Sequence, residues 1–506
     1  MLTVGQQRVD PLALTAVGVL TAAGAGVAVA FPHTMPWSVL AVAAAGLMLC
    51  WAARWEITVW TWMWVLSYGL LDWPQWEMPI TGFFNMTVPR LVFVAAAAAF
   101  GLYFLLHRGR LHFDRGLLWV MLLLTVCVGA SAWATGWTTD IRQPREIVSA
   151  PYYRFLGSIV LPFVMFTLVY NAVRRERQIT WALLLISLYG WYALYVGYLQ
   201  YAAIRGADAA RAFIWPAYIN NPDYGHHFDR ARGAFAAAGP QAAFLVLLFY
   251  TDLFLLRRIR GPAKVAFAAQ ALLVPPAVFF TGMRSAYLAF ALCGIVWLLA
   301  AARNRLGPAK LVVCGLVLLI ATVTIWDRLT STDRMRGGVG QVRPVVARKI
   351  LVAQTWEMVK RRPFFGVGFG HFVDAQRRMR RSPGSLAGLS GGVLVEHNLF
   401  LNMVAETGLI GLALTVGVFV LLFRESVLLY RKLPPGAHGM LSRSFVILFW
   451  IAMVNYLTDA MFRDTLWDVF ANGLFWSLAG LVVAYNRLLE PQPLTLRPVA
   501  PMPVRR

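Results

Sequence analysis

The stretch HNLFLNMVAETGLIGLALTVGVFVLLF, residues 397–423, decides the fold of this chain. After the histidine at its start it carries one ionisable side chain, Glu406, and it can cross a hydrocarbon core of roughly 30 Å as one helix. Backbone groups inside a bilayer must find hydrogen-bond partners within their own segment, so such a run is helical. The stretch therefore predicts a membrane-spanning helix that begins beside a titratable imidazole.

Apolar runs of similar length recur along nearly the whole chain, which is 59% hydrophobic and only 14% charged. The period-2 alternation that marks the strands of a transmembrane barrel is absent. The chain is therefore expected to be an all-α polytopic integral membrane protein with about 12–14 transmembrane helices, the lower numbers applying if one early segment is re-entrant. The expected spans lie near residues 11–31, 36–53, 56–73, 89–106, 116–134, 155–173, 180–204, 237–256, 265–281, 284–302, 311–326, 397–423, 445–461 and 468–486.

Short connections rich in Lys and Arg are expected to face the cytoplasm. They contain Arg108, Arg110, Arg115, Arg174, Arg175, Arg177, Arg257, Arg258, Arg260, Lys264, Arg303, Arg305, Lys310, Arg424, Arg431, Lys432 and Arg443. With all of the expected spans in place, these connections and both termini fall on one side. We therefore expect a single polytopic domain over residues 1–486 and a Pro-rich, disordered cytoplasmic tail over residues 487–506.

The opposite side is expected to carry three sizeable loops, near residues 135–154, 205–236 and 327–396. The last is the largest and holds thirteen Lys and Arg residues against five Asp and Glu residues. Loops of this length escape the rule that places positive charge inside, so their charge needs another explanation. An anionic substrate is favoured over a merely solvated surface.

The large loop contains a basic segment around Arg348 that is typical of an amphipathic helix running to Arg362, after which Pro363 and three glycines predict a tight turn. A second arginine, Arg284, lies in TGMRSAYL, residues 281–288, where a helix begins. Free backbone N–H groups and the helix dipole favour an anion there. An arginine at a membrane boundary can also simply reach toward water. Arg284 is favoured as a site residue, and Arg348 alone allows either interpretation.

His397 is the sharpest candidate for chemistry. A histidine at a helix start is often structural, but this one adjoins a basic loop and has Glu396 and Asn398 as neighbours that can orient the ring. Imidazole is also the side chain best placed to accept a proton near neutral pH. Glu406, further into the span, is either a functional intramembrane acid or a bond to a neighbouring helix, with two nearby glycines allowing close packing.

Metal and nucleotide chemistry find little support in the sequence. The histidines show no HExxH or similar ligand spacing, and the one local cluster, His226-His227 with Asp229, is not favoured as a metal site. Neither a Walker A loop nor a dinucleotide fingerprint is present. We expect no metal and no cofactor.

Several of these motifs resemble, in their order and spacing, the O-antigen ligase and O-antigen polymerase superfamily. They are TGMRSA (281–286), the Arg348 helix leading to PFFGVGFG (363–370), and EHNxxL (396–401) followed by ExGxxG (406–411). The resemblance extends to RARGAF (230–235) and Gly239-Pro240, and covers about residues 225–425. Two departures are Met-Arg-Ser in place of Ser-Arg-Gly and Ala-Ala-Gly-Pro in place of Asn-Pro-Asn, and the second weakens any role for Arg232.

The resemblance implies a GT-C type glycosyltransferase of the bacterial inner membrane, with its active site facing the periplasm. It implies a glycan donor linked to undecaprenyl pyrophosphate, an inverting reaction and no metal. By this analogy His397 is the general base or positions the acceptor hydroxyl, and Arg284 and Arg348 hold the pyrophosphate. The secondary candidates are Arg232, Glu396, Asn398 and Glu406.

The acceptor stays open at this stage. A ligase would use lipid A–core, a polymerase would use another lipid-linked repeat, and a protein O-oligosaccharyltransferase would use a polypeptide. The cationic loop over residues 327–396 favours a ligase, because a lipopolysaccharide core is usually anionic. A transporter is the alternative from another class, but no internal repeat is evident and the candidate residues lie at the expected outer boundary.

Overall fold

A computed structural model shows how the 506-residue chain folds. Apart from a few single positions, the residues that the structure describes are 57–70, 78–80, 84–86, 112–113, 115–138, 151–215, 217–220, 228–303, 343–380, 398–463 and 468–490. The expected spans at 11–31, 36–53 and 311–326, and most of the one at 89–106, lie outside these residues. The total number of spans therefore stays a prediction.

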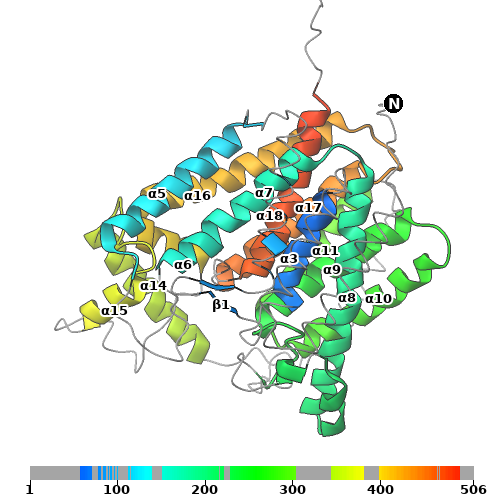
Figure 1. Cartoon of the computed structure of the whole chain (residues 1–506), viewed down its shortest axis with the longest axis horizontal. Helices are drawn as coiled ribbons and strands as arrows, with labels where there is room; N and C mark the ends of the chain where they lie inside the picture. Colours follow the sequence, from blue (N-terminus) through cyan, green and yellow to red (C-terminus); the bar gives the residue numbers. More distant parts are fainter. Residues whose placement is uncertain are drawn as a thin grey trace, which may run out of the picture.

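The described residues form a bundle of long apolar helices (Figure 1), which confirms the predicted all-α polytopic fold. Within them, eight helices are long and apolar enough to cross a membrane. They are α5 (Gly116–Thr135), the continuous segment Pro151–Ala172, α8 (Arg177–Ile204), α9 (Ala238–Arg258), α10 (Ala263–Phe280), α16 (Leu399–Lys432), α17 (Arg443–Phe462) and α18 (Val469–Leu488). The segment Pro151–Ala172 consists of α6 (Pro151–Phe155), a π-helical turn (Leu156–Val160) and α7 (Leu161–Ala172).

Two further apolar helices, α3 (Ile57–Leu70) and α11 (Arg284–Arg303), complete the described bundle. A short antiparallel hairpin of β1 (Met78–Ile80) and β2 (Phe84–Met86) was not predicted from the sequence. The span expected at residues 397–423 also differs from the prediction, because α16 continues to Lys432.

The core is centred on α18, which packs against α3, α7, α9, α16 and α17. Lipid tails are as apolar as the side chains, so helices in a membrane associate through close packing. Gly480 permits such an approach, since a Cβ there would lie 2.7 Å from the Phe166 carbonyl oxygen on α7. On the other side of α18, the Phe475 ring stacks on Tyr456 of α17 with 4.3 Å between centroids. This rigid centre holds the outer helices in place.

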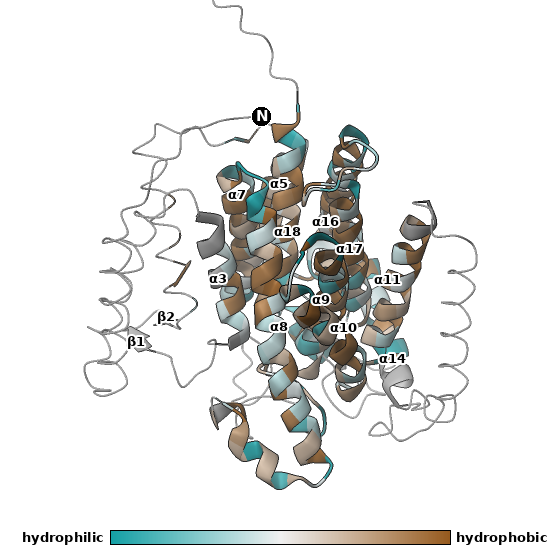
Figure 2. Ribbon diagram, turned by 90° about the vertical axis from the view of Figure 1, so that its right-hand side faces the viewer, coloured by the Kyte–Doolittle hydropathy of each residue, from teal (hydrophilic) through white to brown (hydrophobic). Residues whose placement is uncertain are grey.

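The connections rich in Lys and Arg meet at one end of the bundle, here called the basic end. Arg258 donates to the Gly439 carbonyl at 2.9 Å, and the Tyr485 hydroxyl donates to the Arg175 carbonyl at 2.7 Å. Arg115 pairs with Glu490 at 2.8 Å. The helices stand side by side between this end and the opposite one, here called the loop end, with mostly hydrophobic residues along their middles (Figure 2). The gathering of basic connections at one end agrees with the prediction that they share one side of the membrane.

Candidate functional site

The turn between α10 and α11 places Arg284 at the loop end. Thr281 closes the turn, because its hydroxyl donates to the Val278 carbonyl at 2.7 Å and accepts from the Met283 N–H at 3.3 Å. Gly282 adopts a φ of 60°, a left-handed conformation that suits glycine. Arg284 is the first residue of α11, as the sequence predicted, so its side chain emerges beside the free N–H groups of a helix start.

The Arg284 guanidinium is half-buried and incompletely paired. Within the described part of the chain, its Nε and Nη2 atoms are buried and have no hydrogen-bond partner. The strongest charges acting on it come from Arg348 and Arg230, and both are positive. A buried cation next to two other cations is costly unless an anion joins them. A bound anion would stabilise this arrangement.

Arg230 also belongs to this cluster. It was not predicted as a site residue, and it entered the sequence comparison only as part of the RARGAF motif. Its side chain is 6% exposed and lies over the α10–α11 turn, where a Cβ added at Gly282 would be 3.2 Å from its Cδ atom. Among the described residues, the carboxylate that pairs with it is the exposed one of Asp229, at 3.3 Å. The Ala231 N–H donates to the Phe280 carbonyl at 3.1 Å, which ties this loop to the end of α10.

Arg232 has a different environment from Arg230. Its guanidinium donates to the carbonyl oxygens of Ile219 and Phe235, and it stacks on the Phe228 ring at 4.0 Å. Burial lowers the pKa of the Arg232 side chain to about 10. The contacts show that Arg232 organises its own loop, so the structure favours a structural role over the secondary substrate-binding role that the sequence analysis gave it.

Arg230 and Arg232 also line a cavity of about 220 Å³ at the loop end. Other walls of this cavity are formed by Gln200 of α8, by Arg211 and by the Phe228 ring. Three arginines, Arg211, Arg230 and Arg232, therefore give the cavity a cationic lining. A bulky anionic or hydroxyl-rich ligand bound at the arginine cluster has space beside it.

Arg348 reaches the cluster from the predicted amphipathic helix, which the structure describes as α14 (Arg343–Arg361). The side chain is exposed, and its guanidinium lies over the ring of Phe462, the last residue of α17, at 5.2 Å. This contact is a cation–π interaction that leaves the hydrogen-bonding edge of the guanidinium available. Arg284 and Arg348, predicted from distant motifs, therefore act on one another in the folded chain.

The start of α16 is tied to the same place. The Asn398 Oδ1 atom caps the helix by accepting from the N–H groups of Phe400 and Leu401 at 2.9 and 3.0 Å. Its Nδ2 atom donates to the Met461 carbonyl at 3.0 Å, next to Phe462 and hence to Arg348. Asn398 is a cap and a tether between helices. The predicted site residues His397 and Glu396 lie outside the residues that the structure describes.

The glycine-rich loop after α14 docks on a break in α16. Gly408 has a φ of 69°, and its neighbours bond to the loop: the Leu409 N–H donates to the Pro363 carbonyl at 2.8 Å. The Val367 N–H donates to the Ala405 carbonyl at 2.8 Å. A Cβ at Gly408 would overlap the Phe364 carbonyl. The tight turn that the sequence predicted here is confirmed. The glycines of the loop and of α16 together allow the two segments to pack closely.

Glu406 takes part in a buried ion pair. Arg154 Nη1 donates to both carboxylate oxygens at 2.7 and 2.8 Å, and both side chains are almost fully buried. The Arg154 guanidinium also lies over the Phe369 ring at 4.8 Å. Of the two roles that the sequence left open for Glu406, the structure favours a contact that joins helices. Arg154 was not anticipated, because it lies far away in the chain.

Metal binding gains no support from the described residues, among which no group of three His, Cys, Asp or Glu side chains could hold an ion. The expected absence of a metal stays a prediction, because His226, His227 and His397 lie outside those residues.

Comparison with known proteins finds one family. Residues 271–416 match the family model described as O-antigen ligase, which supports the resemblance seen in the motifs. The match includes Arg284, Arg348, His397 and Glu406, and it stops short of the Arg230–Arg232 segment. No curated protein matches the chain.

Proposed function

We propose that this chain, a multi-pass membrane protein that carries an O-antigen ligase domain over residues 271–416, is a GT-C type glycosyltransferase of the bacterial inner membrane. It moves a glycan from undecaprenyl pyrophosphate to lipid A–core on the periplasmic face. The reaction inverts the anomeric centre and needs neither a metal nor a cofactor. The loop end of the bundle then faces the periplasm, and both termini are cytoplasmic.

The observation that carries this proposal is the unpaired guanidinium of Arg284 in a cluster of three arginines. Two of its buried nitrogen atoms lack partners within the described residues, and Arg230 and Arg348 add positive charge beside it. Guanidinium groups match the oxygen geometry of phosphates, often with two parallel hydrogen bonds. A pyrophosphate brings enough negative charge and enough acceptor oxygens to engage all three side chains.

The chemistry follows from this placement. The acceptor hydroxyl attacks the anomeric carbon, the bond from that carbon to the pyrophosphate oxygen breaks, and the hydroxyl proton passes to His397. Undecaprenyl pyrophosphate leaves with the bonding electron pair, and the arginines stabilise the negative charge that gathers on it. Asn398 supports the role of the adjacent His397, because its bond to Met461 ties the start of α16 to the place where Arg348 lies.

A transfer assay in detergent tests this function. Purified protein given a glycan on undecaprenyl pyrophosphate, together with lipid A–core, should form the joined product without ATP or a sealed vesicle. A transporter cannot give this result, because detergent leaves no second compartment. No product from an authentic donor and acceptor would overturn the proposal.

The acceptor is tested by the same assay with one component removed. Given the donor alone, a ligase forms no product, whereas a polymerase lengthens the glycan. Chain growth without lipid A–core would replace the ligase by a polymerase and would leave the arginine cluster in the same role. A polypeptide acceptor is tested by adding a pilin-like substrate in place of lipid A–core.

A further inference from the structure

A second cationic site lies at the far end of α14, away from the arginine cluster. A cavity of about 300 Å³ opens between the end of α14 and α15 (Phe372–Arg380). Arg361, Arg362 and Arg378 line it, and so do His371 and Asp374. Arg361 is roughly 20 Å along the helix from Arg348, at about 1.5 Å per residue. The two sites are therefore distinct.

The charges in this cavity are mainly uncompensated. The acid that lines it, Asp374, is occupied by His371 at 3.2 Å, and the other ring nitrogen of His371 meets the Gly136 carbonyl at 2.9 Å. Arg361 contacts Glu357 at 2.6 Å but is still more than half exposed. Arg362 and Arg378 are exposed, and within the described residues no acidic partner contacts either of them. The cavity thus presents guanidinium groups to a ligand.

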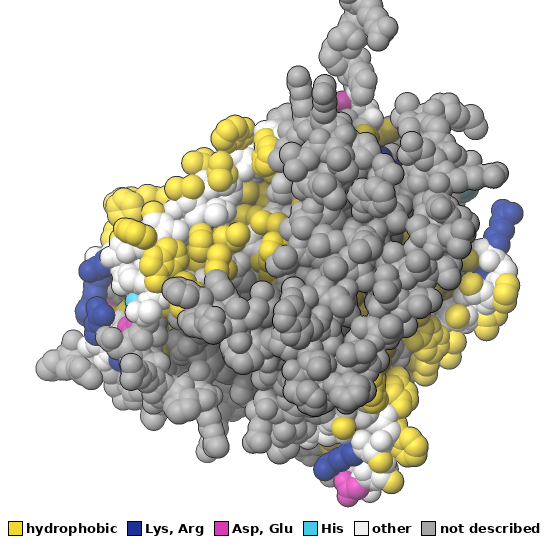
Figure 3. Space-filling model, in the orientation of Figure 1, with side chains coloured by type: hydrophobic (Ala, Val, Ile, Leu, Met, Phe, Trp, Pro, Cys, Tyr) yellow, Lys and Arg dark blue, Asp and Glu magenta, His cyan; other side chains and the backbone are white. Residues whose placement is uncertain are grey.

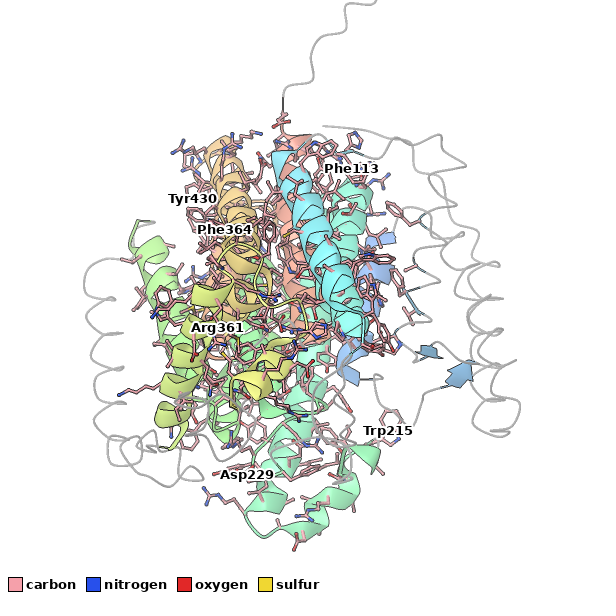
Figure 4. All side chains as sticks on the ribbon, turned by 90° about the vertical axis from the view of Figure 1, so that its left-hand side faces the viewer. Phe113, Trp215, Asp229, Arg361, Phe364 and Tyr430 are labelled. Atoms are coloured by element: carbon pink, nitrogen blue, oxygen red, sulfur yellow. The ribbon has the colours of Figure 1, made fainter. Side chains whose placement is uncertain are left out.

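Two phenylalanines that follow Pro363 place the cavity at a membrane surface. Phe364 and Phe365 are 60% and 75% exposed, and they lie beside Leu409 and Ile410, exposed apolar residues of the spanning helix α16. In Figure 4, Arg361 lies nearer the loop end of the bundle than Phe364 does. Exposed phenylalanines at this depth lie among acyl chains, so the arginines lie among headgroups.

The surface view agrees with this arrangement. Lys and Arg side chains gather at the left edge of the molecule, where Figure 1 places α15, and an apolar surface lies directly above them along α5 and α16 (Figure 3). The cavity, which α15 lines through Arg378, therefore lies close to the boundary between the apolar and cationic surfaces. Its ligand should combine a hydrocarbon tail with an anionic head.

We propose that the cavity between α14 and α15 binds the phosphate monoester headgroup of a membrane lipid, with Arg361, Arg362 and Arg378 on the phosphate and Phe364 and Phe365 among the acyl chains. Arginine recognises phosphate through paired hydrogen bonds, and clusters of basic residues at a membrane surface attract anionic lipids. The site is separate from the arginine cluster at Arg284. It anchors the glycine-rich loop, and with it α14, against the membrane.

Binding of dioctanoyl phosphatidic acid to the full-length purified protein in detergent, followed by native mass spectrometry, tests this proposal. Replacing all three arginines by glutamine should weaken the tightest-bound copy at least about tenfold, since a hydrogen bond to a charged group contributes about 1.5–3 kcal/mol. The control variant carries Arg260→Gln, Arg424→Gln and Arg431→Gln at the basic end, and it should retain that copy. Equal affinity in the wild type and the cavity variant would overturn the proposal.

Three further measurements keep the test decisive. Arg362→Gln alone should measurably weaken binding of the tightest-bound phosphatidic acid molecule. The Arg362 side chain is exposed, so this variant should fold normally. Glycerol phosphate, which carries the same headgroup without a tail, should bind more weakly than dioctanoyl phosphatidic acid. Replacing Phe364 and Phe365 by alanine should reduce only the lipid affinity. If glycerol phosphate and dioctanoyl phosphatidic acid bind equally well, and the alanine replacements change neither affinity, the cavity binds free phosphate. That result would contradict the lipid proposal.

Discussion

At the residue scale, position and pairing separate the arginines of this chain into different roles. Arg154 donates hydrogen bonds to a carboxylate and Arg232 donates to backbone carbonyls, and both side chains hold the fold together. Arg284 is surrounded by positive charge and lacks partners on two nitrogen atoms within the described residues. Leaving a buried donor unpaired has a large cost, so it is a stronger sign of a ligand than the presence of an arginine alone.

Arg284→Lys tests whether the planar guanidinium is required. Lysine keeps the charge but loses the paired donors, and losing a transition-state donor typically costs about 2.7–4 kcal/mol, or roughly 10²–10³-fold in rate. Transfer should fall by that amount, whereas Arg424→Lys at the basic end, where the side chain is exposed, should transfer at the normal rate. Normal transfer by a folded Arg284→Lys variant would mean that Arg284 only anchors a helix.

His397→Ala tests the proton acceptor. If His397 is the general base, removing it should lower transfer by roughly 10²–10⁴-fold while binding of the lipid-linked donor is retained. The assay is single-turnover transfer by purified protein, with expression and thermal stability measured in parallel. Unchanged transfer would rule out His397 as the base. The proposed role of the arginine cluster would then have to be tested by itself.

At the element scale, the docking of the 363–370 loop on α16 holds α14 in position. Four backbone hydrogen bonds join the loop to α16 around the break at Gly408, and the buried Arg154–Glu406 pair joins α6 to the same place. The arginine cluster depends on this contact, because Arg348 lies on the helix that leads into the loop. Both glycine motifs are visible in the sequence, but hydrophobic periodicity does not show that the 363–370 loop docks on the 406–411 segment of α16.

Gly408→Ala tests the docking contact against a matched position in the same helix. Alanine at Gly408 is strained by the positive φ and would overlap the Phe364 carbonyl, so the thermal midpoint in detergent should fall. Gly417 has ordinary helical surroundings and only a distant contact with Val120, so Gly417→Ala should be neutral or stabilising by up to about 1 kcal/mol. Equal stability of the two variants would contradict the docking role.

Glu406→Gln tests the ion pair. Removing one partner of a buried pair leaves an uncompensated charge and costs about 3–5 kcal/mol. The variant should unfold at a lower temperature, and Arg154→Met combined with Glu406→Met should recover part of the loss, because no lone charge then stays buried. If Glu406 instead takes part in catalysis, Glu406→Gln would abolish transfer at full thermal stability.

At the scale of the whole molecule, the sequence predicted the class of fold, and it placed Arg284 and Arg348 at the same end of the bundle as the structure does. Apolar runs located each described span, and basic connections marked one end. The sequence did not single out Arg230, because its burial arises where the loop before α9 folds onto the α10–α11 turn. Nor did it indicate the Arg154–Glu406 pair, which joins distant parts of the chain. Both depend on tertiary contacts that no local pattern encodes.

The central claim is that Arg230, Arg284 and Arg348 hold a pyrophosphate, and lipid affinity tests it most directly. Undecaprenyl pyrophosphate and undecaprenyl monophosphate have the same tail and differ by one phosphate group, so their affinities isolate recognition of the headgroup. The wild type should prefer the pyrophosphate, and Arg230→Gln, Arg284→Gln and Arg348→Gln should each reduce that preference by about tenfold or more. Equal affinity of the wild type for the two lipids, or an unchanged preference in all three variants, would contradict the account.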